Sequence, residues 1–295
     1  MALQEPLRVL EGWLPWCPLE NCWRGSAIPS ERGLYRIRRV GEVGLDYIGQ
    51  TGLTLRRRLG MLVGVYQLEM PYRDPHTAAP ALWALRQALG CTFEASVIPV
   101  PGDTRYRKGL EALAIALYRQ ERGQSPTVNF GRIRRGYRLS SGNNARLVAA
   151  GKRLRGGLTT VAQDNWLEGA SPVGALDGDP QDARWGGHRW SDRAPLREAQ
   201  AQLTAKTPGL YRIRNSDRPG LVYVGEGSIP ERLAAHLAKS NKAGHRQRTL
   251  SATGLECAWT VNPAWPRHQR LELETDLIGA HVLSTGHAPT AQFLG

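Results

Sequence analysis

Residues 33–38 (Gly-Leu-Tyr-Arg-Ile-Arg) alternate between apolar and polar positions. Such alternation of β-prone side chains predicts a strand with one buried face. A second β-prone run ends at Tyr47, Ile48 and Gly49 after a turn through Gly41, and so short a connection predicts an antiparallel hairpin. Apolar residues at helical spacing predict helices over 53–62, 81–89 and 106–120, and a further alternating run predicts a third strand over 93–100.

The same order of elements occurs a second time in the chain. The pattern predicts a hairpin over 210–214 and 221–224, a helix over 231–239, a strand over 255–261 and a long helix over 271–283. Tyr35 and Tyr47 are 12 residues apart, as are Tyr211 and Tyr223, and the two pairs are offset by 176 residues. A repeat of this length sets the number of domains. The expected fold class is α+β, with two related domains, each a small, mainly antiparallel three-stranded sheet flanked by helices.

Changes in composition give the expected domain boundaries. Residues 1–30 form a tryptophan-rich lead-in that should pack on the first domain, which covers 31–131. Residues 132–206 combine a basic segment with a linker rich in Gly, Asp and Pro, and the second domain covers 207–295.

Charge points to a polyanionic partner. The 295 residues carry 39 Lys and Arg against 26 Asp and Glu, a net charge of +13, and such a surplus favours DNA or RNA over other partners. The alternative is a ribosome-like protein, or one that is arginine-rich only because its genome is rich in G and C. Residues 132–155 hold eight basic residues and no acidic one, so they form either a DNA contact or a solvated surface. The candidate DNA-binding residues are Arg132, Arg134, Arg135, Arg138, Asn143 and Asn144.

Cysteine usage and apolar runs bear on location. Cys17 and Cys22 could form half of a zinc site, but no second pair follows at ligand spacing, which favours free thiols in a reducing compartment. The sequence shows neither the pattern of a signal peptide nor 18 consecutive apolar residues. We therefore expect a cytoplasmic protein that does not associate with a membrane.

With these residues in order, the chain resembles the GIY-YIG nuclease family. That family has a Gly-Ile-Tyr strand, a Tyr-Ile-Gly strand, an Arg in the next helix, a Glu in a later helix and often an Asn after it. The first copy offers Gly33-Leu34-Tyr35, Tyr47-Ile48-Gly49, Arg58, Glu111 and Asn129. The second offers Gly209-Leu210-Tyr211, Tyr223-Val224-Gly225, Arg232 and Glu274, with Gln292 in place of the Asn. In both copies 18 residues separate the Glu from this amide, so the resemblance, which covers about 31–131 and 207–295, rests on several elements.

The resemblance implies two GIY-YIG-like domains and a metal-dependent DNA endonuclease that hydrolyses phosphodiester bonds. Glu111 and Glu274 would be the metal ligands, and Mg²⁺ (or Mn²⁺) suits a site with one carboxylate and several waters. Arg58 and Arg232 would bind phosphate oxygens through their planar guanidinium groups. The spacing leaves Arg57 open as an alternative to Arg58.

The resemblance also gives roles to the tyrosines. Tyr35 and Tyr211 would act as general bases or orient the attacking water, although a free tyrosine has a pKa near 10 and needs help to lose its proton. Tyr47 and Tyr223 would position the phosphate or the water, and Asn129 would support the site through hydrogen bonds. Each of these residues alone has an ordinary structural explanation, such as a core tyrosine in a strand. Their recurrence together favours the catalytic interpretation.

The two copies differ in one histidine and one amide. His236 follows Arg232 by one helical turn and could share in proton transfer, whereas the first copy has Leu62 at that place. His76 lies on a long insertion and could reach the first site, but nothing in the sequence shows that it does. Because the Asn is the better supported family residue, we expect the first copy to be the more active.

Three functions remain open at this point. In the first, two fused nuclease domains each cut one strand, so that a monomer acts as a pseudo-dimer. In the second, the protein binds DNA and one or both domains, more readily the second, are catalytically silent. In the third, the fold carries another chemistry, because a fold does not determine a function.

Overall fold

The fold is described from a computed structural model. The structure describes residues 5–68, 71, 76, 78–131, 168–216, 220–240, 244–246 and 254–294. Among them, contacts divide the chain into two compact units: an N-terminal unit of residues 9–107, 126–131 and 168, and a C-terminal unit of residues 5–8, 108–125 and 169–294. These units do not follow the sequence repeat, because residues 108–125 of the first copy belong to the C-terminal unit. The domain boundaries expected from the sequence stay predictions.

The first half of the chain alternates strands with short helices. Its elements are α1 (Glu5–Glu11), β1 (Cys17–Pro18), η2 (Cys22–Arg24), β2 (Gly33–Arg39), β3 (Leu45–Thr51), α2 (Leu55–Gly60), η3 (Val63–Tyr66), α3 (Ala79–Leu89), β4 (Phe93–Pro99), α4 (Thr104–Arg122) and η4 (Asn129–Gly131). The strands and helices predicted from periodicity are confirmed. Gly90 ends α3 in the left-handed conformation, which glycine adopts without a steric penalty.

The second half repeats this order. Its elements are η5 (Trp185–Gly187), β5 (Ala194–Pro195), α6 (Leu196–Gln202), β6 (Pro208–Asn215), β7 (Leu221–Ser228), α7 (Ile229–Ser240), β8 (Leu255–Val261) and α8 (Arg267–Thr285). Strand β8 has the bounds that its alternating pattern predicts. Gly286 ends α8 in the same way that Gly90 ends α3.

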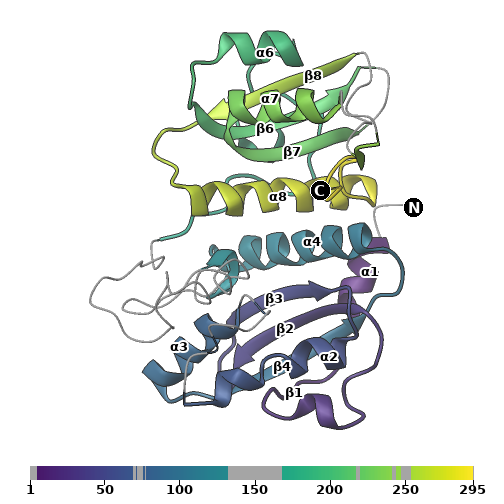
Figure 1. Ribbon diagram of the computed structural model, residues 1–295, viewed down its shortest axis with the longest axis vertical. Coiled ribbons are helices and arrows are strands. Elements are labelled where there is room, and N and C mark those ends of the chain that lie inside the picture. The colour runs from purple at the N-terminus through teal and green to yellow at the C-terminus, as the bar shows by residue number, and fades with distance from the viewer. Residues whose placement is uncertain are drawn as a thin grey trace. The chain divides into compact units, whose positions relative to one another are not determined.

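The α+β class with two antiparallel sheets is confirmed, but each sheet has four strands rather than the predicted three (Figure 1). The strand order is β1-β4-β2-β3 in one sheet and β5-β8-β6-β7 in the other. The additional strands, β1 and β5, are two residues long and lie at an edge of their sheets. Both end in a proline, which an edge strand tolerates because its N–H is not needed for pairing. Two residues are too few to show an alternating pattern, so the sequence did not reveal these strands.

The edge strands show that the repeat extends beyond the family-like motifs. Cys17 pairs with Ala95 in the first sheet, and Ala194 pairs with Cys257 at the matching place in the second. A tryptophan that precedes each edge strand stacks on an arginine of the central strand. Trp13 lies 4.5 Å from the Arg36 guanidinium, and Trp190 lies 4.6 Å from that of Arg212. Cation–π contacts of this kind hold the lead-in of each copy against its sheet.

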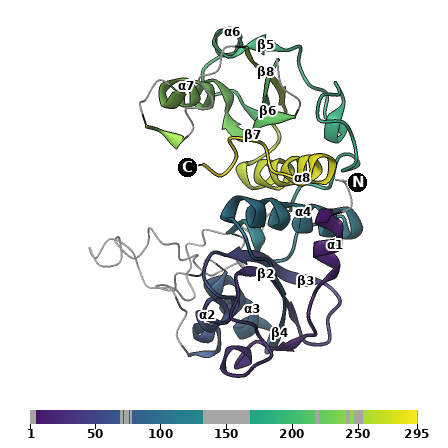
Figure 2. The ribbon, with the colours of Figure 1, turned by 90° about the vertical axis from the view of Figure 1, so that its right-hand side faces the viewer.

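Alternation along the central strands separates two faces. In the N-terminal unit, Tyr35 and Ile37 of β2 pack with residues of α2 and α3 in one buried core. In the C-terminal unit, Tyr211 and Ile213 of β6 pack with α6 and α7 on one face, and Leu210 packs with α8 on the other. Figure 2 shows α7 and α8 on opposite sides of β6 and β7.

Helices α4 and α8 pack closely within the C-terminal unit, and both ribbon views show them side by side (Figures 1 and 2). A Cβ atom added at Gly279 of α8 would lie only 2.7 Å from the Cβ of Ala116 on α4 and 3.0 Å from the carbonyl oxygen of Ala112. Glycine at this position therefore lets the two backbones approach.

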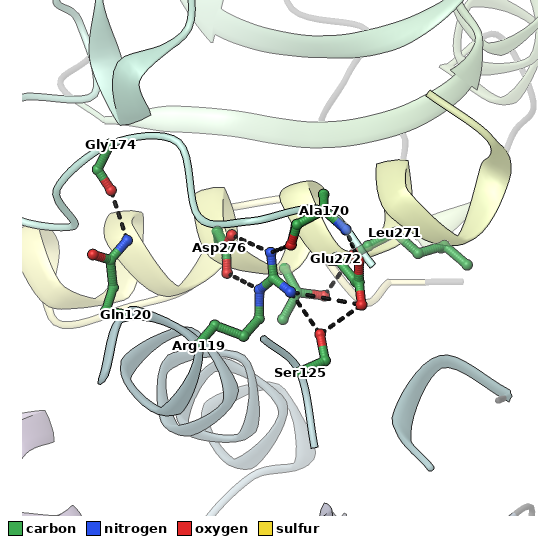
Figure 3. Close-up of polar contacts among 9 residues, drawn as sticks. Arg119, Gln120, Ser125, Ala170, Gly174, Leu271, Glu272 and Asp276 are labelled. Atoms are coloured by element: carbon green, nitrogen blue, oxygen red, sulfur yellow. Dashed lines mark hydrogen bonds and ion pairs between the residues drawn. The ribbon is translucent and has the colours of Figure 1, made fainter. Parts of the chain in front are cut away.

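A buried arginine joins the same two helices (Figure 3). The Arg119 guanidinium donates to both carboxylate oxygens of Asp276, at 2.7 and 3.0 Å, and lies 3.6 Å from the Glu272 carboxylate. It also donates to the Ser125 hydroxyl at 2.6 Å and to the Ala170 carbonyl at 2.9 Å. A charge removed from water in this way is stabilised only while its partners stay in place.

Within the part of the chain that the structure describes, no helix has the length and apolar character needed to cross a membrane.

Candidate functional site

In the N-terminal unit, strands β2 and β3 bring Tyr35 and Tyr47 together with Arg58 of α2. The two tyrosine rings lie 5.8 Å apart, and the Arg58 Nε donates to the Tyr35 hydroxyl oxygen at 3.3 Å. Arg57 is exposed and contributes its backbone N–H to the Thr54 cap of α2, so the contact with Tyr35 favours Arg58 as the site arginine. The Tyr35 side chain is fully buried, whereas Tyr47 and Arg58 are half-buried, so the cluster extends from the core toward the surface.

His76 completes this cluster. It lies between η3 and α3, and not on α2, whose counterpart in the second copy carries a histidine. Its Nε2 lies 2.8 Å from the Tyr35 hydroxyl oxygen, and its ring packs edge-on against Tyr35 and Tyr47. The backbone N–H of Ala78 donates to the His76 Nδ1 at 3.2 Å. Burial, assisted by the charge of Arg58, lowers the pKa of His76 well below its usual value, so the ring is neutral.

The contact with Ala78 sets the direction of the bond to Tyr35. Because the Nδ1 of His76 accepts a hydrogen bond, the single proton of the neutral ring lies on Nε2, which donates to the Tyr35 oxygen. Tyr35 therefore accepts hydrogen bonds from both His76 and Arg58. Donors aimed at a phenol oxygen favour its deprotonated form, whereas the full burial of Tyr35 acts in the opposite direction.

Asn129 supports the first cluster from the edge of the sheet. Its side-chain amide accepts from the backbone N–H of Ile48 and donates to the Ile48 carbonyl, both at 2.9 Å. The Asn129 amide thus pairs with the backbone of β3 as a residue of a neighbouring strand would, at the position next to Tyr47. Gln292 takes the corresponding place in the second copy and accepts from the Val224 N–H at 3.1 Å. The exchange of Asn for Gln therefore keeps this backbone contact.

The C-terminal unit holds the matching cluster of Tyr211, Tyr223 and His236. The Tyr211 hydroxyl lies 2.8 Å from His236 Nε2, the tyrosine rings stack at 6.0 Å, and the Tyr223 ring lies 4.6 Å from the imidazole. Burial lowers the pKa of His236 to about 4, with lesser contributions from Lys239 and Arg232. Burial also raises the pKa of Tyr211 well above its usual value. Both groups are therefore neutral near pH 7.

Two details separate this cluster from the first. The Nδ1 of His236 has no hydrogen-bond partner among the described residues, so nothing fixes the position of its proton. Arg232 is directed to the end of β7, where its Nε donates to the backbone carbonyl of Glu226 at 3.2 Å. The Glu226 carboxylate is buried and lies 3.1 Å from Arg270 and 3.8 Å from Arg267 of α8.

Glu274, the predicted metal ligand of the second copy, is half-buried on α8. Burial, together with the charge of Glu226, raises the pKa of Glu274 to about 8, against the opposing effect of Arg232 and Arg267. Among the described residues no group of three or more His, Cys, Asp or Glu side chains is placed to hold a metal ion. A cation at this site would rely on Glu274 and water, a donor set that Mg²⁺ accepts.

Other predicted site residues are placed differently. Glu111 is half-buried on α4 and belongs to the C-terminal unit. The six residues predicted to contact DNA lie outside the described residues, so that prediction stays a prediction. They are Arg132, Arg134, Arg135, Arg138, Asn143 and Asn144.

Sequence reasoning left two contacts without an assignment. His76 was considered, but its contact with Tyr35 spans 41 positions, and no motif spacing marks it. Glu226 was not considered. The only available signal was an acidic residue directly after Tyr-Val-Gly, where the first copy has the neutral Gln50.

Comparison of the chain with protein-family models, with curated proteins and with solved structures gave no match.

Proposed function

We propose that this protein is a metal-dependent DNA endonuclease with two GIY-YIG-like copies, of which the first is the working site. The observation that carries the proposal is the tyrosine–histidine contact, which occurs at 2.8 Å in both copies. His236 makes it from the helix after the hairpin, and His76 makes it from a different segment. His76 and His236 come from positions that do not correspond in the two copies, yet each places an imidazole against the equivalent tyrosine. This agreement supports a chemical role for the contact.

In the first copy, Tyr35 would accept the proton of the attacking water while His76 and Arg58 donate to its oxygen. A planar guanidinium such as that of Arg58 is a group that suits phosphate oxygens. Tyr47, held beside Tyr35 through the strand edge that Asn129 supports, would orient the water or the phosphate. A divalent cation held by a carboxylate and water would supply charge neutralisation at the phosphate.

The second candidate is a DNA-binding protein without cleavage. The net charge of +13 supports it as well as it supports a nuclease. The geometry of the second copy supports a catalytically silent site in that copy, because the Nε of Arg232 donates to the backbone carbonyl of Glu226.

The test is cleavage of supercoiled plasmid by the full chain with Mg²⁺ or Mn²⁺, compared with the same reaction in EDTA. We expect metal-dependent nicking that Tyr35→Phe lowers by about a hundredfold or more, as loss of a general base does. Tyr66→Phe is the matched control, because it removes a tyrosine hydroxyl that is not part of the cluster. Retarded migration of DNA without any cleavage in either metal would overturn the nuclease proposal and favour the binding protein.

A further inference from the structure

The residue after the Tyr-(Ile/Val)-Gly strand differs in charge between the copies. The first copy has Gln50, and the second has Glu226. The Glu226 side chain is buried, at 5% exposure, and is therefore held by its surroundings rather than by water. Its carboxylate oxygens lie 3.1 Å from the Nε of Arg270 and 3.8 Å from the Nε of Arg267. A buried carboxylate with two guanidinium neighbours is a strongly paired group.

The backbone carbonyl of the same residue accepts a hydrogen bond from the site arginine. In the first copy Arg58 donates to the Tyr35 hydroxyl at 3.3 Å. In the second, Arg232 donates its Nε to the Glu226 backbone carbonyl at 3.2 Å. The matching arginines thus have different acceptors: a candidate catalytic oxygen in one copy and a strand end in the other.

Gly227 makes this second arrangement sterically possible. Its φ is +127°, in a region that side-chain-bearing residues rarely adopt, and an added Cβ would lie 3.0 Å from the Nε of Arg232. The first copy has Thr51 at this place. The Glu226-Gly227 pair therefore supplies both the carboxylate that binds the helix arginines and the space in which Arg232 lies against the strand.

We propose that the Glu226 carboxylate takes the place of a DNA phosphate in the second copy, and that it holds Arg267 and Arg270 away from the substrate. We call this arrangement the Glu226 latch. It rests on the proposed nuclease function and gives that function an asymmetry: the first site cuts and the second is held inactive. Because a carboxylate and a phosphate oxygen compete for the same guanidinium donors, a neutral side chain at position 226 releases them to DNA.

Glu226→Gln tests the latch, because it installs the amide that the first copy carries and keeps the length of the side chain. The variant is made in the full chain with Tyr35→Phe, so that only the second site can cut. We expect metal-dependent nicking by the double variant to exceed that of Tyr35→Phe alone by about a hundredfold, because Arg270, released from the carboxylate, becomes a donor to the charged transition state. Glu256→Gln, which neutralises a carboxylate 2.6 Å from Arg214 on the same sheet, is the matched control and should give no gain.

A second readout does not depend on cleavage. In EDTA, Glu226→Gln should bind a short DNA duplex more tightly and with a steeper salt dependence, because the released arginines neutralise additional phosphates. Thermal unfolding of each variant shows whether the fold is kept. If it is, a variant that gains neither cleavage nor DNA affinity has not failed through misfolding.

The outcomes separate the two proposals. If the parent chain cuts and the double variant cuts no better than Tyr35→Phe, with an unchanged salt slope, the latch is wrong and the nuclease stands. If Tyr35→Phe alone keeps most of the activity, the second site is already active and the latch is wrong. If the parent chain never cuts, the nuclease proposal fails, and the salt slope alone then decides whether Glu226 withholds arginines from DNA.

Discussion

Removing the buried guanidinium of Arg119 should destabilise the C-terminal unit strongly. The side chain is fully buried and makes a two-pronged contact with Asp276 at 2.7 and 3.0 Å. Glu272, also buried, lies 3.6 Å from it. In Arg119→Leu both carboxylates remain in the core without their cation. Breaking a buried pair in this way costs about 3–5 kcal/mol, because the remaining charge has been removed from water.

The charge that is left behind should make the loss depend on pH. Burial already raises the pKa of Asp276 to about 6, although Arg119 acts in the opposite direction. Without Arg119 the pKa of this carboxyl rises further in the folded state, which then binds more protons than the unfolded state as the pH falls. The variant should therefore regain stability between pH 8 and pH 5, and its deficit relative to the parent should shrink.

Urea unfolding followed by tryptophan fluorescence measures both effects. Arg122→Leu is the control, because it removes an exposed arginine of the same helix that pairs with its neighbour Glu121. It should change the free energy of unfolding by less than about 1 kcal/mol. A triple variant that adds Glu272→Gln and Asp276→Asn should recover part of the loss. A deficit below about 1 kcal/mol at pH 8, or no recovery in the triple variant, would refute the reasoning.

Three further predictions concern single residues. Asn129→Ala should lower the free energy of unfolding by about 2–4 kcal/mol, because both backbone groups of Ile48 lose a buried partner; a change below 1 kcal/mol in chemical denaturation would contradict this. Gly279→Ala should lower the melting temperature although alanine favours helices by about 1 kcal/mol, since the new methyl would lie 2.7 Å from Ala116, and a raised melting temperature would show that the helices can separate. Burial lowers the pKa of His281 to about 4, so unfolded chains bind more protons than folded ones between pH 6.5 and 4, and the free energy of unfolding should fall on acidification. His281→Gln should make this pH dependence shallower, and an unchanged dependence would count against the role given to His281.

Periodicity predicted the long elements well because each has one continuous buried face. Apolar residues at helical spacing are buried in the two long helices, such as Leu110 and Leu113 of α4 and Leu273 and Leu277 of α8, and Leu255 and Cys257 are buried at alternate positions of β8. The two-residue strands β1 and β5 bury too little to leave such a pattern. Their position depends on pairing with β4 and β8, which is a tertiary contact.

The candidate site could be predicted only where it follows the motif order. Tyr35, Tyr47 and Arg58 come from consecutive elements of one hairpin and helix, so their proximity follows from the local fold. His76 comes from a segment whose path the sequence does not determine. Glu226 was missed for a different reason: its effect lies in the partners of its carboxylate, Arg267 and Arg270, which are contributed by a helix 41 or more residues away in the chain.

The two copies share the contact between tyrosine and histidine and differ in the arginine. In both, a neutral imidazole lies 2.8 Å from the buried tyrosine hydroxyl. Among the described residues, only in the first do a fixed histidine proton and Arg58 both point at that oxygen. The Asn and the His that distinguish the copies in sequence are less informative than the acceptor of the arginine. Gln292 makes the backbone contact of the missing Asn in the second copy, and His76 makes the tyrosine contact of the missing His in the first. A difference in activity between the copies should therefore follow the position of Arg58 and Arg232.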